Sequence, residues 1–319
     1  MGRALKQAKV EGLRIVGHDK EPTNASKAQK LGAVDKVEWN IIEATKDAGV
    51  VIVATPVMAI KDVMEAIGPH VKPGCVVTDT GSTKAQVLKW AEEILPKGVS
   101  FVGGHPMAGK ETSGPENAEA DLFRGAVYCV IPAKDAAPEA VQAVVGIAEL
   151  VGAKPFFLSV GEHESFVAAV SHLPIVLSAA LVSSTSKSPS WHEMSKLAAS
   201  AYRDVTRLAS GDPEMNRDIC MTNRQEIVSW IDRMIAELLE FKRLMNENEK
   251  GLAQVFANVH EARERWVNHL IESPGGQASV GGLPSAGERL SSLLVGELLS
   301  KKGKAMMDRY ENKDGKSKK

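Results

Sequence analysis

The sequence lacks the features that mark several large classes of protein. Aromatic residues make up only 5% of its 319 residues, and the formal net charge is −1. A near-neutral chain has no field that would attract nucleic acid or an anionic membrane, so neither is expected as a main partner. We find no apolar run long enough to span a bilayer and no basic-then-apolar leader. The sequence therefore predicts a cytoplasmic protein without a membrane partner.

Cysteine is scarce as well. The three cysteines, Cys75, Cys129 and Cys220, lie far apart, are odd in number and show no metal-ligand spacing. This pattern suits a reducing cytoplasm, and we predict no metal site. The remaining composition, with 44% hydrophobic and 25% charged residues, is typical of a globular chain. Its length allows two domains of ordinary size.

The first half of the chain alternates strand and helix patterns. The run GVVIVATP at 49–56 is apolar on both faces, which is typical of a buried parallel strand covered by helices on both sides. The alternation continues to about residue 158 and predicts an α/β domain with a doubly wound, mostly parallel, Rossmann-like sheet over 1–158.

The rest of the chain has helical periodicity and no strand signal. We expect an all-helical second domain over 159–272. Residues 273–319 are predicted to form a Gly/Pro/Ser loop, a short helix and a disordered, lysine-rich tail.

The opening residues resemble the second part of a dinucleotide-binding unit. Such a unit needs a strand, a glycine-rich turn, a helix, a second strand and an acid. Gly2 stands where the last fingerprint glycine should be, and Asp19 where the acid that binds the ribose should be. The first strand and the two earlier glycines have no counterpart, so we expect a sheet that lacks its first strand. A start codon chosen too late would produce this, whereas a chain complete as written should bind NAD weakly and be less stable.

This half-fingerprint is not specific by itself, because any helix–strand unit can have a glycine before the helix and an acid after the strand. If a dinucleotide binds, the carboxylate of Asp19 would repel a 2′-phosphate and so favours NAD over NADP. Thr55 and Pro56 follow a buried strand, where open α/β sheets bind ligands. An ordinary turn that ends a strand would read in the same way.

Two further loops follow predicted strands and should open at the same edge of the sheet. VTDTGSTK at 77–84 contains Ser82, and FVGGHPMAGKETSG at 101–114 contains His105 and Glu111. A histidine between Gly-Gly and Pro sits on a tight turn, which favours chemistry, although a structural role stays open. Six other histidines are predicted at surface or capping positions, namely His18, His70, His163, His192, His260 and His269.

The helical half contains two unusual stretches. VSHLP at 170–174 places His172 just before a proline, and YRDVTRLASGDPEMNRD at 202–218 groups several charges. Arg203 fits a solvated helix face. Arg207 lies among apolar residues and is a candidate for holding a substrate carboxylate with both ends of its guanidinium.

Taken together, GGHPMAGKETSG, TDTGSTK, SHLP and RDVTRLASGDPEMNRD resemble the prephenate and arogenate dehydrogenases of tyrosine biosynthesis, over the chain to about residue 270. The resemblance implies a Rossmann domain, a helical domain that forms a homodimer, and NAD-dependent oxidative decarboxylation of a small cyclohexadienyl acid.

The resemblance also implies roles for individual residues. His105 would hydrogen-bond the ring hydroxyl and take its proton, with Ser82 orienting it. Arg207 would bind a substrate carboxylate. The other residues that it implies are Glu111, His172 and Asp204 on the substrate side and Gly2, Asp19, Thr55 and Pro56 on the cofactor side.

Some alternatives stay open. Members often have a second histidine after SHLP, but here Ile175 follows the proline, so we expect weak tyrosine inhibition. Prephenate is favoured over arogenate as substrate, without a residue that decides between them. A β-hydroxyacid-type dehydrogenase is a second enzyme hypothesis, against which the GGHP turn argues. A non-catalytic NAD-binding dimer is the third.

Overall fold

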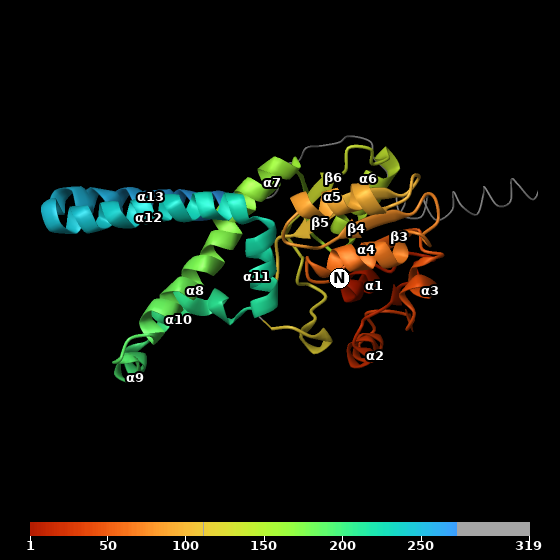
Figure 1. The fold of residues 1–319 in the computed structure, drawn as a ribbon, viewed down its shortest axis with the longest axis horizontal. Helices are drawn as coiled ribbons and strands as arrows, with labels where there is room; N and C mark the ends of the chain where they lie inside the picture. The colour runs from red at the N-terminus through yellow and green to blue at the C-terminus, as the bar shows by residue number, and fades with distance from the viewer. Residues whose placement is uncertain (111, 273–319) are drawn as a thin grey trace, which may run out of the picture. The chain divides into compact units, whose positions relative to one another are not determined.

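The computed structural model describes residues 1–110 and 112–272 (Figure 1). These residues form two compact units. The first contains Met1–His163 together with Gly211–Thr222, and the second contains Glu164–Ser210 and continues from Asn223. The chain therefore leaves the first unit, returns to it for one helix, α11 (Pro213–Thr222), and leaves it again.

The first unit is built on a five-stranded sheet in the order β3-β4-β5-β6-β7. Neighbouring strands are parallel except β5 and β6, which run antiparallel with His105 opposite Cys129. This arrangement confirms the predicted doubly wound, mostly parallel sheet. The strands are β3 (Val50–Val53), β4 (Val76–Asp79), β5 (Ser100–Pro106), β6 (Val127–Pro132) and β7 (Lys154–Phe157).

Successive side chains along these strands belong in alternation to two apolar clusters, one on each face of the sheet. Val51 and Val77 pack against helices α4 (Ala59–Ile67) and α5 (Ala85–Ile94). Val76 and Val102 belong to the other cluster, which also takes in helix α6 (Pro138–Leu150). Burial on both faces explains why these strands read as continuous apolar runs in the sequence.

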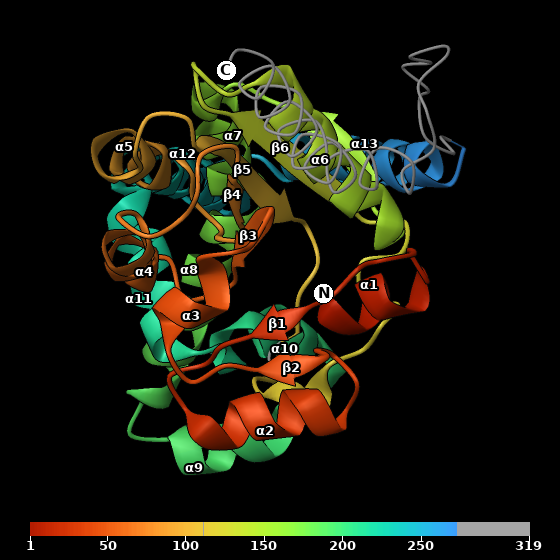
Figure 2. The same cartoon turned by 90° about the vertical axis from the view of Figure 1, so that its right-hand side faces the viewer.

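A separate two-stranded parallel sheet pairs β1 (Val16–Gly17) with β2 (Lys36–Val37) (Figure 2). β1 and β3 are each the last strand of their sheet, and no strand among the described residues pairs with their outer edges. A doubly wound sheet of this kind has its first strand in that position. The helices around the small sheet are α1 (Gly2–Gln7), α2 (Pro22–Lys30) and α3 (Ile41–Thr45).

The first elements are shorter than the sequence indicates. The apolar and basic residues at 3–12 recur at helical spacing and predict a helix there, but α1 ends at Gln7, and Lys9 and Gly12 then adopt positive φ angles of 50° and 74°. The run LRIVGHD at 13–19 predicts a short strand, but only Val16 and Gly17 pair with a neighbour. A strand hydrogen-bonded on one side receives half of the backbone bonds that a central strand receives, which accounts for its short length.

Close packing places α1. A Cβ atom on Gly2 would lie 2.2 Å from the carbonyl oxygen of Ala33, so no larger residue fits there without movement. On the same helix, Ala4 and Leu5 are buried in the cluster that contains α6. The lack of a side chain at Gly2 thus lets the first helix lie close to the backbone at Ala33.

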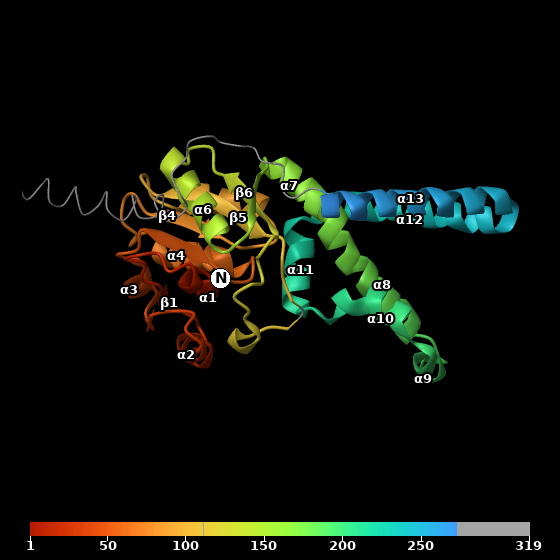
Figure 3. The ribbon, with the colours of Figure 1, turned by 180° about the vertical axis from the view of Figure 1, so that it is seen from behind.

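The described residues of the second unit are all helical. Helix α12 (Arg224–Glu247) pairs with α13 (Glu249–Glu272) (Figure 3). Between them, the rings of Phe241 and Phe256 meet edge to face with centroids 5.6 Å apart. Helix α7 (Val160–Val167) passes from the first unit into the second. The other helices are α8 (Leu173–Ser186), α9 (Trp191–Met194) and α10 (Ser200–Thr206).

Helices α7 and α8 are joined by one π-helical turn, Ala168–His172, into a continuous helix over Val160–Ser186. Its mean hydropathy reaches 2.0, so by length and composition it is able to cross a membrane. The sequence interpretation that no apolar run is long enough is therefore wrong. Polar residues such as Glu164 and His172 interrupt the run in the sequence, although the helix continues through them. One such helix is weak evidence for a membrane, because core helices of soluble proteins pass the same test.

Candidate functional site

The turn after β4 is held by a buried ion pair. The side chains of Asp79 and Lys84 are both fully buried and in direct contact. Asp79 also accepts hydrogen bonds from the backbone N–H groups of Gly81, at 2.8 Å, and Gly104, at 3.2 Å. A buried carboxylate and ammonium are tolerated only with such partners, so these bonds fix the turn that carries Ser82 against β5.

Close approach of the backbone at β5 requires glycine. A Cβ atom on Gly104 would lie 2.5 Å from both the carbonyl oxygen of Asp79 and the hydroxyl of Tyr128. The Gly-Gly pair before His105 thus lets β5 pass close to the β4 turn and to β6. This packing places His105 at the carboxyl end of β5, beside the end of the parallel strand β4.

His105 is 6% exposed, and its Nδ1 atom lies 2.9 Å from Nε2 of His163 on α7. The two rings meet edge to face, with centroids 5.2 Å apart and planes at 68°. The prediction that His163 is a surface or capping residue is wrong, since its side chain is fully buried. Val167, one turn further along the helix, is buried on the same face, and this helical spacing is the signal that was missed.

Two hydroxyls lie on the β4 turn. Ser82 is half-buried, and the structure thus brings its turn and His105 to neighbouring strand ends. The Thr83 hydroxyl is 2.8 Å from the hydroxyl of Thr222 at the end of α11, which ties the turn to that helix. Sequence reasoning did not identify Thr83, because nothing in the local pattern shows that α11 returns to this unit. Glu111 lies outside the described residues.

Tyr128 and Cys129 of β6 are ionisable neighbours of β5. Burial, and next the charge of Asp79, raises the pKa of Tyr128. Burial likewise raises the pKa of Cys129 to about 11, although Lys84 acts in the other direction. Both groups therefore stay protonated at neutral pH, and Cys129 is not a thiolate nucleophile.

The cofactor-side residues lie at strand ends. Asp19 follows β1, and its Oδ1 atom accepts a hydrogen bond from the Glu21 N–H at 2.8 Å. Thr55 and Pro56 follow β3, and the Thr55 hydroxyl oxygen is buried without a hydrogen-bond partner among the described residues. An acid and an unsatisfied hydroxyl fit the ribose and sheet-edge side of a dinucleotide.

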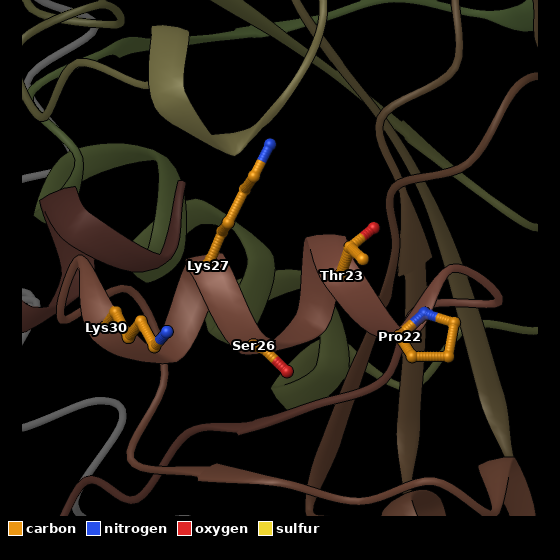
Figure 4. Close-up of a pocket in the computed structure, with 5 residues that line it drawn as sticks. All are labelled: Pro22, Thr23, Ser26, Lys27 and Lys30. Carbon is orange, nitrogen blue, oxygen red and sulfur yellow. The ribbon is translucent and has the colours of Figure 1, made fainter.

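A hollow on the surface of helix α2 is lined by one face of that helix alone (Figure 4). It contains none of the predicted site residues, and one of its lysines, Lys27, pairs with Glu116 at 3.3 Å. We assign it no role. Its lining residues are Pro22, Thr23, Ser26, Lys27 and Lys30.

The remaining predicted residues belong to the helical unit. His172 is fully buried, and its Nδ1 atom lies 3.3 Å from the side-chain nitrogen of Asn223, which donates to the carbonyl oxygen of Glu164 at 2.8 Å. Asp204, near the end of α10, and Arg207, at the start of the following turn, are both exposed. Sequence reasoning did not identify Asn223, since its partners lie more than 50 residues away.

The segment that carries Arg207 is anchored to α8. The N–H of Ala209 donates to the Ser178 hydroxyl at 2.9 Å, and the hydroxyls of Tyr202 and Thr185 are 2.8 Å apart. These bonds fix the backbone on both sides of the arginine while its side chain stays exposed. Such an arrangement is suited to binding an anion.

Two family models and several known proteins match this chain. Residues 1–156 match a family described as prephenate dehydrogenase, nucleotide-binding domain, and residues 159–258 match prephenate dehydrogenase, dimerization domain. The chain is 33% identical to a prephenate dehydrogenase of Bacillus subtilis over 79% of this chain and 69% of that protein. It is 28% identical to a cyclohexadienyl dehydrogenase of Zymomonas mobilis over 77% of this chain and 85% of that protein.

A crystal structure shows the same architecture. Prephenate dehydrogenase from A. aeolicus, solved with hydroxyphenyl propionate and NAD+, superposes with a TM-score of 0.77 at 29% identity. The match covers 83% of this chain and 92% of that one. The resemblance found in the sequence motifs is confirmed, and with two family domains in the expected order this chain belongs to the prephenate dehydrogenase family.

Proposed function

We propose that this protein catalyses the NAD-dependent oxidative decarboxylation of prephenate to 4-hydroxyphenylpyruvate, with arogenate as the alternative substrate. The observation that carries the proposal is the buried His105 at the end of β5, beside the turn that holds Ser82. Family membership and the NAD+ complex of the A. aeolicus relative support it.

In this proposal the chain's own residues align the substrate and move one proton. His105 accepts the proton of the ring hydroxyl, and Ser82 helps to orient the ring of the histidine. Arg207 binds a substrate carboxylate, and His172 and Asp204 complete the substrate side. NAD, when bound, accepts the hydride from the carbon that carries the hydroxyl. Loss of the ring carboxylate is favourable because an aromatic ring results.

The cofactor would be held by residues at the ends of β1 and β3. Asp19 binds the ribose hydroxyls, and Thr55 and Pro56 line the sheet edge. Because the carboxylate of Asp19 repels a 2′-phosphate, NAD is preferred over NADP. The α1 helix approaches the cofactor closely at Gly2.

The experiment that tests this function compares prephenate and arogenate as substrates, with NAD and then NADP, by NADH or NADPH absorbance. We expect turnover with NAD and a higher kcat/KM for prephenate. A higher kcat/KM for arogenate would reassign the substrate. NAD binding in a calorimetric titration without turnover of either acid would instead support a non-catalytic NAD-binding protein.

We also propose that the protein is a homodimer formed by its helical unit. The family description of residues 159–258 as a dimerization domain supports this. So do large apolar side chains left exposed on α12 and α13, which a second copy would cover. They include Ile235, Leu238, Leu239, Phe256, Val259 and Trp266.

Replacing Leu238 and Leu239 together by glutamate is expected to convert the dimer to a monomer, because the charges would be buried without partners at the interface. Light scattering after size-exclusion chromatography measures the mass. The matched control is Glu237→Lys, which changes a charge at a polar, exposed position of the same helix and should remain dimeric. A double variant that keeps the dimer mass would contradict this interface.

A further inference from the structure

We propose that His163 is a positioning residue for His105, which selects the tautomer of His105 and shares the positive charge that His105 gains. The inference rests on the proposed function, in which His105 accepts the proton of the substrate hydroxyl, and it identifies what prepares the ring for that task. His163 was not among the residues that the family resemblance implied.

Nδ1 of His105 and Nε2 of His163 are 2.9 Å apart, a hydrogen-bonding distance, and both rings are buried. Two neutral imidazoles at this distance have one hydrogen between the facing nitrogens. Each of the two possible arrangements determines the state of the other nitrogen of His105.

The tautomer decides whether His105 can act as a base. If Nδ1 of His105 carries the hydrogen and donates it to His163, Nε2 of His105 keeps its lone pair and can accept a proton. If His163 donates instead, Nε2 of His105 carries a hydrogen and can only donate. The proposed reaction requires the first arrangement, so His163 must act as the acceptor, with its own hydrogen on Nδ1.

The contact also has a role after proton transfer. The substrate O–H bond breaks, its electron pair stays on the oxygen as the carbonyl forms, and a new N–H bond forms at Nε2 of His105. The Nδ1 hydrogen of His105 is then shared with Nε2 of His163. The positive charge spreads over two rings in a buried place, where a charge-assisted hydrogen bond is strong.

Other ionisable side chains near β5 are already engaged or neutral. Asp79 is bonded to Lys84 and to two backbone N–H groups. The thiol of Cys129 and the phenol of Tyr128 are kept protonated by burial. The ionisable residues of the two helices that pack on β5 lie at exposed positions, namely Lys89, Glu92 and Glu93 of α5 and Glu139 and Glu149 of α6.

Two substitutions at His163 separate positioning from charge sharing. Glutamine in His163→Gln keeps an oxygen that can accept from Nδ1 of His105, but it cannot take up a proton. Phenylalanine in His163→Phe keeps a ring of similar size and removes the acceptor. If the phenylalanine variant does not fold, His163→Asn replaces it, because its shorter side chain does not reach Nδ1. His70→Gln, at an exposed position, is the control.

The primary measurement is the tautomer of His105, read by long-range 1H–15N NMR in protein labelled at histidine, without cofactor or substrate. We expect hydrogen on Nδ1 in the parent protein, in His70→Gln and in His163→Gln. In His163→Phe we expect it to move to Nε2. An unchanged tautomer in His163→Phe would overturn the proposal.

Kinetics provide the second measurement. We expect kcat to fall by about tenfold or more in His163→Phe, with KM within about twofold, as for loss of an aligned general base. In His163→Gln we expect the acid limb of the kcat–pH profile to move, because the charge is no longer shared. If the tautomer responds as expected and no variant or parent turns over prephenate or arogenate, the proposed function fails and the histidine pair stands. If the enzyme turns over prephenate or arogenate but the tautomer of His105 is unchanged in His163→Phe, the proposed function stands and the role of His163 fails.

Discussion

The variant His105→Ala is expected to lower kcat by at least about a hundredfold, because the ring hydroxyl loses the group that accepts its proton. The dissociation constant for NAD should change little, since the predicted cofactor residues lie at the ends of β1 and β3. KM for prephenate should rise less than kcat falls. Steady-state kinetics together with calorimetric titration of NAD measure these quantities separately.

The matched control for this prediction is His18→Ala. His18 is exposed, and its Nδ1 atom lies 3.1 Å from the carbonyl oxygen of Glu38, at some distance in the sequence from the β4 and β5 turns. Its removal should leave kcat within about twofold. A His105→Ala variant with parental kcat would refute the assignment of the base, whatever the effect of the control.

The variant Asp79→Ala is expected to lower the free energy of unfolding by about 3–5 kcal/mol, the usual cost of leaving one partner of a buried pair unpaired. The loss should be large here because the carboxylate also accepts from the N–H groups of Gly81 and Gly104. Urea unfolding followed by circular dichroism measures the change. The turn that carries Ser82 should loosen as well, so kcat should fall in parallel.

Two further variants test whether the loss of stability is specific to the buried pair. Lys89 and Glu93 form an exposed pair on α5 at 3.9 Å, and Lys89→Ala should leave the urea concentration at the midpoint of unfolding unchanged. The double variant Asp79→Leu with Lys84→Met should recover part of the stability lost in Asp79→Ala, because no lone charge remains buried. A midpoint for Asp79→Ala equal to that of Lys89→Ala would show that the pair contributes nothing.

Much of the first unit was predictable because its signals are local. Runs such as GVVIVATP show burial on both faces of a strand. The expectation of a tight turn at His105 is wrong, because β5 continues through His105 and Pro106 and pairs them with β6. The motifs at 101–114 and 202–218 carried the family resemblance, which the domain matches confirmed. Local pattern and family membership together therefore determined the architecture and the main candidate residues.

The features that were missed depend on contacts between distant parts of the chain. The antiparallel pairing of β5 with β6 is set by how the strands meet, and the apolar pattern of each strand is the same in either direction. His163 is buried because α7 brings it to His105, 58 residues earlier. Thr83 meets Thr222 across an even longer separation, 139 residues. The periodicity of a single sequence cannot reveal contacts between residues that lie so far apart in the chain.

Strands β1 and β3 each have an outer edge that pairs with no strand among the described residues, and this has a consequence for handling the protein. On β1, Val16 is 37% exposed. On β3, which is entirely apolar, Val50 and Ile52 are half-buried. Backbone groups at such edges recruit extended segments of other molecules, and β-branched residues favour that addition. Precipitation of concentrated samples is therefore expected to begin by strand addition at these edges.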